Sequence, residues 1–378
     1  MGKVWWYGFF VVLLHLSMKS KTALPLVTAL LMTIFASSCQ NGGSMKPVAP
    51  GDPIDWKDSA GRLALQIENS YNNDENDSVY QLSPVAMELC REHGQWQYYY
   101  YVWSLMAMTY IWDYQPSEAI REAQQMQEDA LARGDNYGLS KAYIVLGEAY
   151  AAQDNYSEMA HAYRNALDIH ADADGFGSKS TVYGKYCMAL KAQGKYEEMD
   201  SVLERWKVEV DRYPLPKALD DAGSLQGKVS KPDAIAHCHY EYLYWLATSL
   251  IHEKEYQEAE AAVDSASYYL DISGRTVINL SRHEGLCYEL AKCKGDYKEA
   301  LASCNRKMAL TPSRTSSNYL AALEKRSIAY ELLGRYQEAL ADYREFQSLT
   351  DSVRQEESQE QLNELNKRFE LNELKAEK

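Results

Sequence analysis

Apolar residues recur at helical spacing along most of the chain, in pairs of stretches that are separated by short polar breaks. In the clearest pair the recurring positions are Tyr143, Leu146, Gly147 and Tyr150, followed by Met159, Tyr163 and Ala166. Steps of three and four residues place such side chains along one side of a helix. The pattern therefore predicts two helices that bury these sides against each other, with a tight turn near Asp154.

The sequence at the start of the second helix of this pair returns along the chain with a regular period. A tyrosine is followed two residues later by Glu and three residues later by Ala or Met in segments 156–159, 196–199, 256–259, 297–300 and 336–339. Segment 116–119 is a sixth copy with Pro116 in place of the tyrosine, and successive copies are 40, 40, 60, 41 and 39 residues apart. The Glu falls in the first turn of the predicted helix, where a negative charge favours the positive end of the helix dipole.

The position two residues before the tyrosine is suited to ending the preceding helix in four copies, where it holds Asp154, Gly194, Gly295 or Gly334. Glycine enters the left-handed backbone conformation without steric cost, which makes it a common helix terminator. Tyr114 and Lys254 are the exceptions at this position. Each copy therefore reads as a helix, a turn and a second helix.

Six such copies in phase resemble the tetratricopeptide repeat (TPR), and the resemblance covers about residues 100–350. It implies an all-α fold, a right-handed superhelical solenoid of helix–turn–helix repeats with a period of about 40 residues. The usual period of the family is thirty-four, so longer helices or loops are expected here. In the family the first helices of successive repeats line a concave groove.

The repeat phase divides the chain into segments. We predict a degenerate cap at about 58–94, six repeats at about 95–352, and an insertion punctuated by Pro and Gly at about 213–232. A charged helix is expected at 353–378, with a short apolar stripe at Leu362, Leu365 and Phe369. Its residues 365–374 resemble the juxtamembrane end of repeat-type sensor proteins.

The N-terminus has the features of an export signal. An apolar run from Leu24 to Phe35 follows two lysines and ends in small residues before Cys39, which resembles the lipobox of bacterial lipoproteins. That resemblance implies a signal peptide at 18–38, lipidation of Cys39 and a flexible tether at 39–57. The run is short for a membrane span, which is the alternative reading. A second apolar stretch lies upstream, so we interpret Met18 as the start of translation and 1–17 as an artefact of start assignment.

Lipoprotein sorting in some Gram-negative bacteria depends on the residue after the lipidated cysteine, which is Gln40 here. By that rule a residue other than Asp implies the outer membrane. Since no acidic run follows Cys39, we expect the protein to be anchored in the cell envelope, at the outer membrane, facing the periplasm.

Composition narrows the classes of partner. The formal net charge is -15, and the segment before Cys39 carries lysines but no acids, so the remaining chain is more acidic still. An acidic surface repels phosphate backbones, which argues against nucleic acid as a partner. The 30 tyrosines suit helix contacts that are apolar on one side and hydrated on the other.

The chain offers little that suits catalysis. No sequence typical of a metalloprotease, a nucleophile elbow or a phosphate-binding loop occurs. His237 and His239 are two residues apart, so on a helix they point to nearly opposite sides and cannot share one metal ion. We therefore expect no enzyme activity, no metal and no cofactor.

Three features of the sequence allow two interpretations each. The cysteines after Cys39 read as small buried hydrophobes, although a disulfide among Cys287, Cys293 and Cys304 is an alternative. Aromatic residues crowd into 96–114, as core or as a platform for stacking a ligand. Asp-Ser-(Val/Ala) triplets read as helix-start residues or as O-glycosylation sites, and they begin at Asp58, Asp77, Asp200, Asp264 and Asp351.

The repeat phase also predicts which residues face the groove. These are Tyr101, Met108, Trp112, Lys141, Glu148, Lys185, Tyr244, Trp245 and Arg282. The predicted function is a non-enzymatic scaffold that binds a protein or peptide in the cell envelope. The alternative is an extracytoplasmic sensor input domain of a signalling or transcriptional regulator whose membrane and output parts are missing or separate. The lysine and asparagine clamp of chaperone-binding family members is not matched, so capture of a free peptide C-terminus is not expected.

Overall fold

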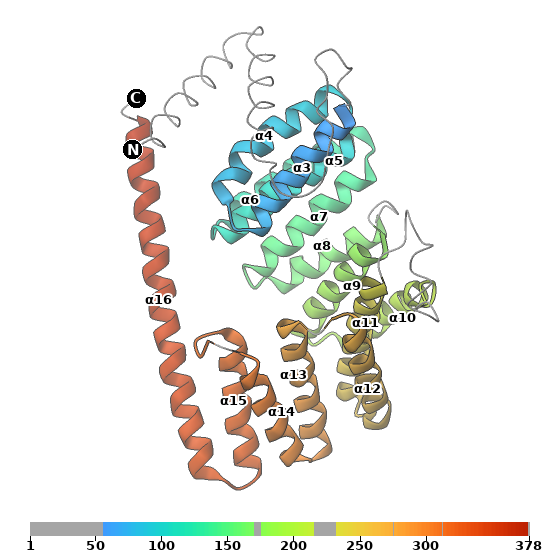
Figure 1. The fold of residues 1–378 in the computed structure, drawn as a ribbon, viewed down its shortest axis with the longest axis vertical. Coiled ribbons are helices and arrows are strands. Elements are labelled where there is room, and N and C mark those ends of the chain that lie inside the picture. Colours follow the sequence, from blue (N-terminus) through green and yellow to red (C-terminus); the bar gives the residue numbers. More distant parts are fainter. Residues whose placement is uncertain (1–55, 170–174, 215–231, 275, 312, 377–378) are drawn as a thin grey trace, which may run out of the picture. The chain divides into compact units, whose positions relative to one another are not determined.

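In the computed structural model the described residues are 56–169, 175–214, 232–274, 276–311 and 313–376. The predicted signal peptide, Cys39 and most of the tether lie outside them, as does most of the predicted insertion. Fourteen helices occupy the described residues, and no strand occurs among them (Figure 1). No helix in these ranges is both long and apolar enough to cross a membrane.

The helices alternate between a first and a second helix of each pair. The first helices are α3 (Trp56–Asn72), α5 (Trp96–Trp112), α7 (Asn136–Ala151), α9 (Gly175–Ala192), α11 (Pro232–Glu253), α13 (Val277–Lys294) and α15 (Ser317–Leu332). The second helices are α4 (Asn76–Glu92), α6 (Pro116–Arg133), α8 (Tyr156–Asp168), α10 (Tyr196–Asp211), α12 (Tyr256–Ile272), α14 (Tyr297–Ala309) and α16 (Tyr336–Ala376). The prediction of an all-helical repeat array is therefore confirmed.

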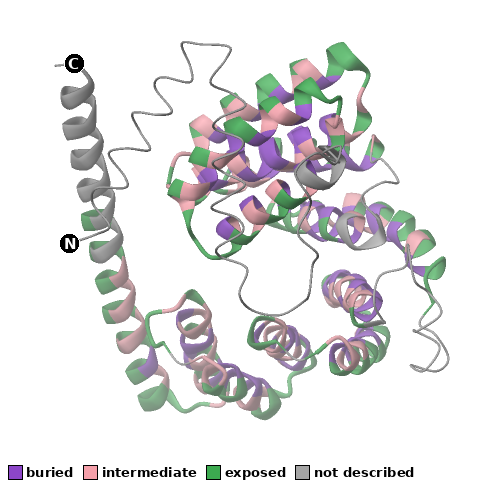
Figure 2. Ribbon diagram, turned by 45° about the horizontal axis from the view of Figure 1, so that its top comes forward, coloured by how far each residue is buried: buried purple, intermediate pink, exposed green. Residues whose placement is uncertain are grey.

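Neighbouring helices along the chain pack against each other throughout the described array. Each second helix also contacts the first helix of the following pair, as α6 does with α7 and α14 with α15. Figure 2 shows the buried residues on the helix sides that face other helices and the exposed residues on the outer sides. The burial of one side of each helix is what the spacing of apolar residues predicts.

The turns between paired helices share one backbone conformation. Gly194, Gly295 and Gly334 have φ values of 69°, 79° and 74°. Tyr114 and Lys254, the exceptions in sequence, adopt the same left-handed conformation with φ values of 56° and 68°. The packing of the two helices therefore requires this conformation at the position, whichever residue occupies it.

The last second helix differs from the others in length. The other second helices have between 13 and 18 residues, whereas α16 has 41 and runs through Tyr336–Ala376 without a break (Figure 1). The charged helix predicted at 353–378 is thus a continuation of the repeat helix rather than a separate element.

The fold bears on two smaller readings, that of the cysteines and that of the Asp-Ser triplets. The six cysteines within the described residues are free, so the disulfide alternative is not observed there. Cys90, Cys187, Cys238 and Cys304 are buried and Cys287 is half-buried, whereas Cys293 is exposed, so the reading as a buried residue is wrong at Cys293. Burial raises the pKa of the Cys90 thiol to about 11 and that of Cys304 to about 12. Reading the Asp-Ser triplets as helix starts is wrong at three of them, because they lie inside α10, α12 and α16: Asp200, Asp264 and Asp351.

The aromatic crowd at 96–114 is divided between core, half-buried and exposed positions. Tyr99, Tyr100 and Trp103 are buried and meet edge to face, with ring centroids 5.1 Å and 5.5 Å from Tyr99. Trp112 and Tyr114, at the end of the segment, are instead 63% and 62% exposed. The helix thus uses its middle turns for packing and leaves large rings in solvent at its C-terminal end.

Candidate functional site

Three ion pairs connect first helices on the side where the groove was predicted. They are Glu148–Lys185, Glu241–Arg282 and Glu289–Lys325, with nitrogen–oxygen contacts at 3.0, 3.0 and 2.7 Å. We call these pairs the ion-pair row. They link α7 to α9, α11 to α13 and α13 to α15. Because the pairs are partly exposed, each is expected to stabilise the fold by only about 0–1 kcal/mol.

Glu148 holds two neighbours at once. Besides Lys185, its carboxylate accepts a hydrogen bond from the Tyr163 hydroxyl at 2.6 Å. Tyr163 comes from α8 and is 1% exposed. Burial, followed by the charge of Glu148, raises the pKa of the Tyr163 hydroxyl far above its usual value of 10, so it stays a donor. One carboxylate therefore ties α7 to α8 and α9.

Arg282 combines an ion pair with an aromatic contact. Its guanidinium carbon lies 4.5 Å from the centroid of the Tyr244 ring while its nitrogens bond Glu241. Burial acts to lower the pKa of Arg282, but the charge of Glu241 outweighs it, and the net effect raises the pKa. The structure thus brings the predicted residues Tyr244 and Arg282 into one contact.

Aromatic side chains dominate the predicted residues of α5. The Trp112 indole N–H donates to the Tyr71 hydroxyl at 2.8 Å, which links α5 to α3. The Lys141 ammonium lies 5.8 Å from the Tyr101 ring centroid, which links α5 to α7. Met108 is half-buried against a cluster of small apolar residues.

The prediction that Trp245 faces the groove is wrong. Its side chain is 6% exposed and belongs to a core cluster with Trp206. A Cβ at Gly184 of α9 would lie 3.3 Å from the Trp245 ring nitrogen, so the missing side chain of this glycine leaves room for the indole. Trp245 is therefore a packing residue rather than part of an open surface.

A group of lysines around Glu289 was not predicted. Glu289 accepts hydrogen bonds from Lys292 and Lys325, both at 2.7 Å. Burial acts to raise the Glu289 pKa, but the charges of the two lysines outweigh it and lower the pKa. Lys191 of α9 responds to the same charges: burial lowers its pKa, Glu289 raises it and Lys325 lowers it again. Lys191 is thus within reach of the electrostatic influence of Lys325 and Glu289.

Lys191 differs from the other lysines in the group. Its side chain reaches solvent, although enough protein surrounds its ammonium to lower the pKa, and this ammonium has no ion-pair partner among the described residues. Lys307 of α14, by contrast, is 9% exposed, and burial together with Lys325 lowers its pKa. We call Lys191, Lys292, Lys307 and Lys325 the lysine cluster. Glu289 bonds two of these four lysines, so the cluster has an excess of positive charge within an acidic chain.

A spacing signal for the cluster exists in the sequence. Glu289 follows Arg282 by seven residues, or two helical turns, and therefore lies on the same side of α13. Lys191 follows Lys185 by six residues, a step that places it about 120° away around α9. Extending the predicted groove by two turns along the first helices would therefore have found Glu289 but not Lys191.

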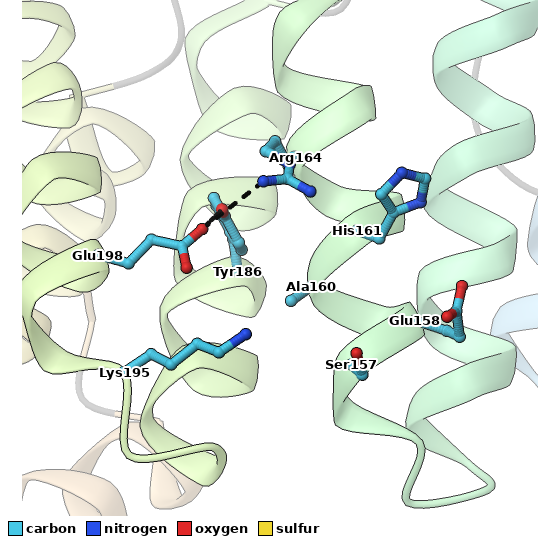
Figure 3. Close-up of a pocket in the computed structure, with 8 residues that line it drawn as sticks. All are labelled: Ser157, Glu158, Ala160, His161, Arg164, Tyr186, Lys195 and Glu198. Atoms are coloured by element: carbon cyan, nitrogen blue, oxygen red, sulfur yellow. Dashed lines mark hydrogen bonds and ion pairs between the residues drawn. The ribbon is translucent and has the colours of Figure 1, made fainter.

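A polar pocket of about 280 Å³ lies between α8, the end of α9 and the start of α10 (Figure 3). Its wall includes Arg164, Tyr186, Lys195 and Glu198. Glu198 accepts a hydrogen bond from Tyr186 at 2.6 Å and lies 3.9 Å from Arg164. One of the two carboxylates in the pocket wall, Glu198, is thus already engaged by the protein, and the remaining wall carries both signs of charge.

His237 and His239, which the sequence analysis excluded as ligands of one metal ion, have different neighbours in the structure. His237 lies 3.8 Å from Glu241, whereas the His239 ring nitrogen contacts the Tyr213 carbonyl at 2.9 Å. The His239 ring also stacks on Tyr269 at 4.6 Å. No group of three or more His, Cys, Asp or Glu able to hold a metal ion occurs within the residues that the structure describes.

Comparison with protein-family models finds no match, and comparison with curated proteins finds none. Solved structures are similar in fold. The APC/C hetero-tetramer Cut9-Hcn1 matches with a TM-score of 0.51 and 12% identity, over 76% of this chain and 46% of that one. PilF of Pseudomonas aeruginosa matches with a TM-score of 0.44 and 14% identity, over 71% of this chain and 98% of that one. A tetratricopeptide repeat protein of Parabacteroides merdae matches with a TM-score of 0.43 and 16% identity, over 68% of this chain and 87% of that one.

These similarities concern the fold. The chain spans less than half the length of Cut9-Hcn1, and the identities are low. The array of helix pairs is a TPR-type solenoid. What such a surface binds depends on the residues that it presents.

Proposed function

We propose that the chain is a non-enzymatic scaffold that binds a protein partner through the ion-pair row and the lysine cluster. The observation that carries this proposal is the excess of positive charge at Lys191, Lys292 and Lys325 within a chain of net charge -15. Complementary charge steers a partner toward its site and suppresses wrong partners. The partner segment is therefore acidic.

The neighbouring aromatic groups support the same site. Tyr288 lies beneath two lysines, with Lys292 and Lys325 at 5.3 Å and 5.0 Å from its ring centroid. These cation–π contacts and the bonds to Glu289 fix the ammonium groups in place. An acidic peptide then meets charges that are already positioned, which reduces the entropy lost on binding.

A labelled peptide rich in Glu, with a matched peptide carrying Gln instead, tests the proposal by fluorescence anisotropy. Lys191→Glu should weaken binding of the Glu peptide about tenfold or more, because it places like charges together. Lys298→Glu on α14 is the control, since it makes the same change in net charge on another exposed lysine. Equal affinity for both peptides, or no effect of Lys191→Glu, would disprove the acidic-partner proposal.

The site of action is part of the same proposal. A lipid at Cys39 anchors the chain to the outer membrane, facing the periplasm, which is supported by the lipobox-like residues 36–39 and by Gln40. In the full chain, Cys39→Ser should abolish labelling by an alkyne palmitate analogue and move the protein to the soluble fraction. Unchanged labelling and membrane fractionation would exclude this anchor.

One observation favours the alternative of a sensor input domain. The helix α16 continues for 41 residues, well beyond the length of the other second helices, and such a helix suits a connection to a further part. Intact mass measurement of the native protein distinguishes the two. A mass well above 43.1 kDa would favour the sensor, whereas a processed and lipidated chain would favour the anchored scaffold.

A further inference from the structure

A buried lysine occupies a position of the repeat that is otherwise apolar. Lys307 is the eleventh residue of α14 and is 9% exposed. In the second helices from α4 to α12 the eleventh residue is uncharged and between 0% and 1% exposed: Ala86, Met126, Ala166, Trp206 and Ala266. A charged group at such a position costs free energy unless a group of opposite charge compensates it.

The Lys307 ammonium lies over a glycine on the groove side of α13. Gly285 follows Arg282 by three residues and precedes Glu289 by four, so it lies on the same side of α13 as the ion-pair row. A Cβ added at Gly285 would lie 3.6 Å from the Lys307 nitrogen. Apart from the chain neighbours of Gly285, no other described side chain comes within 4 Å of that Cβ. Because Gly285 is itself half-buried, the glycine leaves a space at the ammonium that is open to the groove.

The acids nearest to this space along α13 are already bonded to other cations. Both Glu284 oxygens accept from the Arg306 guanidinium, at 3.0 and 2.9 Å. Glu289 accepts from two other lysines of the cluster. The Lys307 ammonium has no ion-pair or hydrogen-bond partner within the part of the chain that the structure describes. Burial, followed by the charge of Lys325, lowers the Lys307 pKa, which is the direction expected for an uncompensated ammonium.

An external carboxylate would supply what the ion-pair row lacks at this point. On this side of α13 the cations Arg282 and Lys325 are each paired with a glutamate, whereas Lys307 is not. One unpaired positive charge calls for one negative charge, which a carboxylate carries at neutral pH. A hydrogen bond between two ionised groups is also stronger than one between neutral groups.

We propose that the space over Gly285 binds a carboxylate, which pairs with the Lys307 ammonium. The carboxylate belongs to an acidic side chain of the partner, and in this respect the inference rests on the proposed function. The other lysines of the cluster attract an acidic segment in any register, because charge acts over a distance. A buried pair depends on close placement of both groups. Lys307 therefore selects which acidic residue of the partner lies over α13.

Lys307→Met in the full chain tests this proposal. Methionine occupies the equivalent position in α6, where Met126 is 0% exposed, so the variant is expected to fold. Without ligand it should melt above wild type, because it removes an uncompensated buried charge. It should bind the Glu peptide about tenfold or more weakly in fluorescence anisotropy, because the charge-assisted contact is lost. Lys298→Met, at an exposed lysine of α14, is the control and should leave both measurements nearly unchanged.

Free acetate distinguishes this site from the proposed function. Sodium acetate should raise the melting temperature of wild type more than sodium chloride at equal concentration, and Lys307→Met should abolish this difference. Equal affinity of wild type and Lys307→Met for the Glu peptide, with equal responses to acetate, would overturn the carboxylate site. A variant that melts well below wild type would also overturn it, because the ammonium would then be compensated within the chain.

Two other results separate the sources of the carboxylate. If acetate alone distinguishes wild type from Lys307→Met, the site stands and its ligand is a free carboxylate. If the Glu peptide distinguishes them, an acidic side chain of the partner is supported. The proposed function fails separately, when wild type binds the Glu and Gln peptides equally.

Discussion

A glycine in α7 offers the sharpest test of how the helices pack. A Cβ added at Gly147 would lie 2.6 Å from Cζ of Tyr163 and 2.8 Å from two further ring atoms. Real Cβ contacts do not approach so closely, so Gly147→Ala requires the ring to move. Tyr163 is 1% exposed, and its hydroxyl is held by Glu148 at 2.6 Å, which leaves the ring little room.

The change in the free energy of unfolding caused by Gly147→Ala has favourable and unfavourable contributions. Alanine favours a helix over glycine by about 1 kcal/mol. Overpacking costs about 1–3 kcal/mol, and loss of the hydrogen bond from Tyr163 to Glu148 adds about 1–3 kcal/mol because one partner is charged. The sum of these terms is a net loss, and we therefore expect Gly147→Ala to lower the free energy of unfolding by about 1–5 kcal/mol, with the loss concentrated in α7 and α8.

Gly285→Ala in α13 is the matched control. There the nearest neighbour of an added Cβ is the Lys307 nitrogen at 3.6 Å, an ordinary contact. The helix preference then acts alone, and a gain of up to about 1 kcal/mol is expected. Urea unfolding followed by circular dichroism measures both variants, and hydrogen exchange locates the change. If Gly147→Ala proved as stable as Gly285→Ala, the close packing of Tyr163 on α7 would be refuted.

Three further predictions concern single side chains. Lys254→Gly should raise the free energy of unfolding by about 1 kcal/mol, because the backbone φ of 68° at this position is left-handed. Gly194→Ala should lower the free energy of unfolding for the same reason. If both variants changed stability in the same direction in thermal melts, the role of the left-handed turn would be contradicted. Trp245→Ala should lower the free energy of unfolding by about 3–5 kcal/mol in urea, as expected for a core aromatic residue. Unchanged stability of this variant would show that Trp245 is not part of the core. Burial, followed by the nearby Asp200 carboxylate, raises the pKa of Glu253 above 4.5, so its contribution to stability is present below pH 4.5 and is lost as pH rises through the folded-state pKa. Glu253→Gln should therefore be slightly more stable than wild type at pH 7 and equal to it at pH 4; a variant less stable at pH 7 in thermal melts would reverse this sign.

The repeat phase was enough to predict the helices because each pair buries one side of each helix at regular spacing. It was not enough to predict which side chains of a first helix stay in solvent. Lys185 and Trp245 occupy equivalent positions, eleven residues before the second helix. The lysine extends its charged end to Glu148, whereas the indole fills the space that Gly184 leaves on the neighbouring helix. That space depends on a residue of another repeat.

The turns illustrate a similar limit. Residue preference marked Tyr114 and Lys254 as unsuited to a left-handed turn, yet both adopt it. The helices on either side contribute many contacts, which outweigh about 1–2 kcal/mol of local strain at one residue. The lysine cluster was missed for a different reason. Its members come from α9, α13, α14 and α15, and no single repeat contains them together.

The uninterrupted α16 gives the end of the array a mechanical property. At 1.5 Å per residue its 41 residues make a rod about 60 Å long. Only the first turns can pack on α15, which has 16 residues, so the contact acts as a fulcrum near one end of the rod. A tilt of about 5° at that contact moves the far tip by about 5 Å, given this rise per residue. Small adjustments in how α15 and α16 pack are thereby amplified along the length of α16.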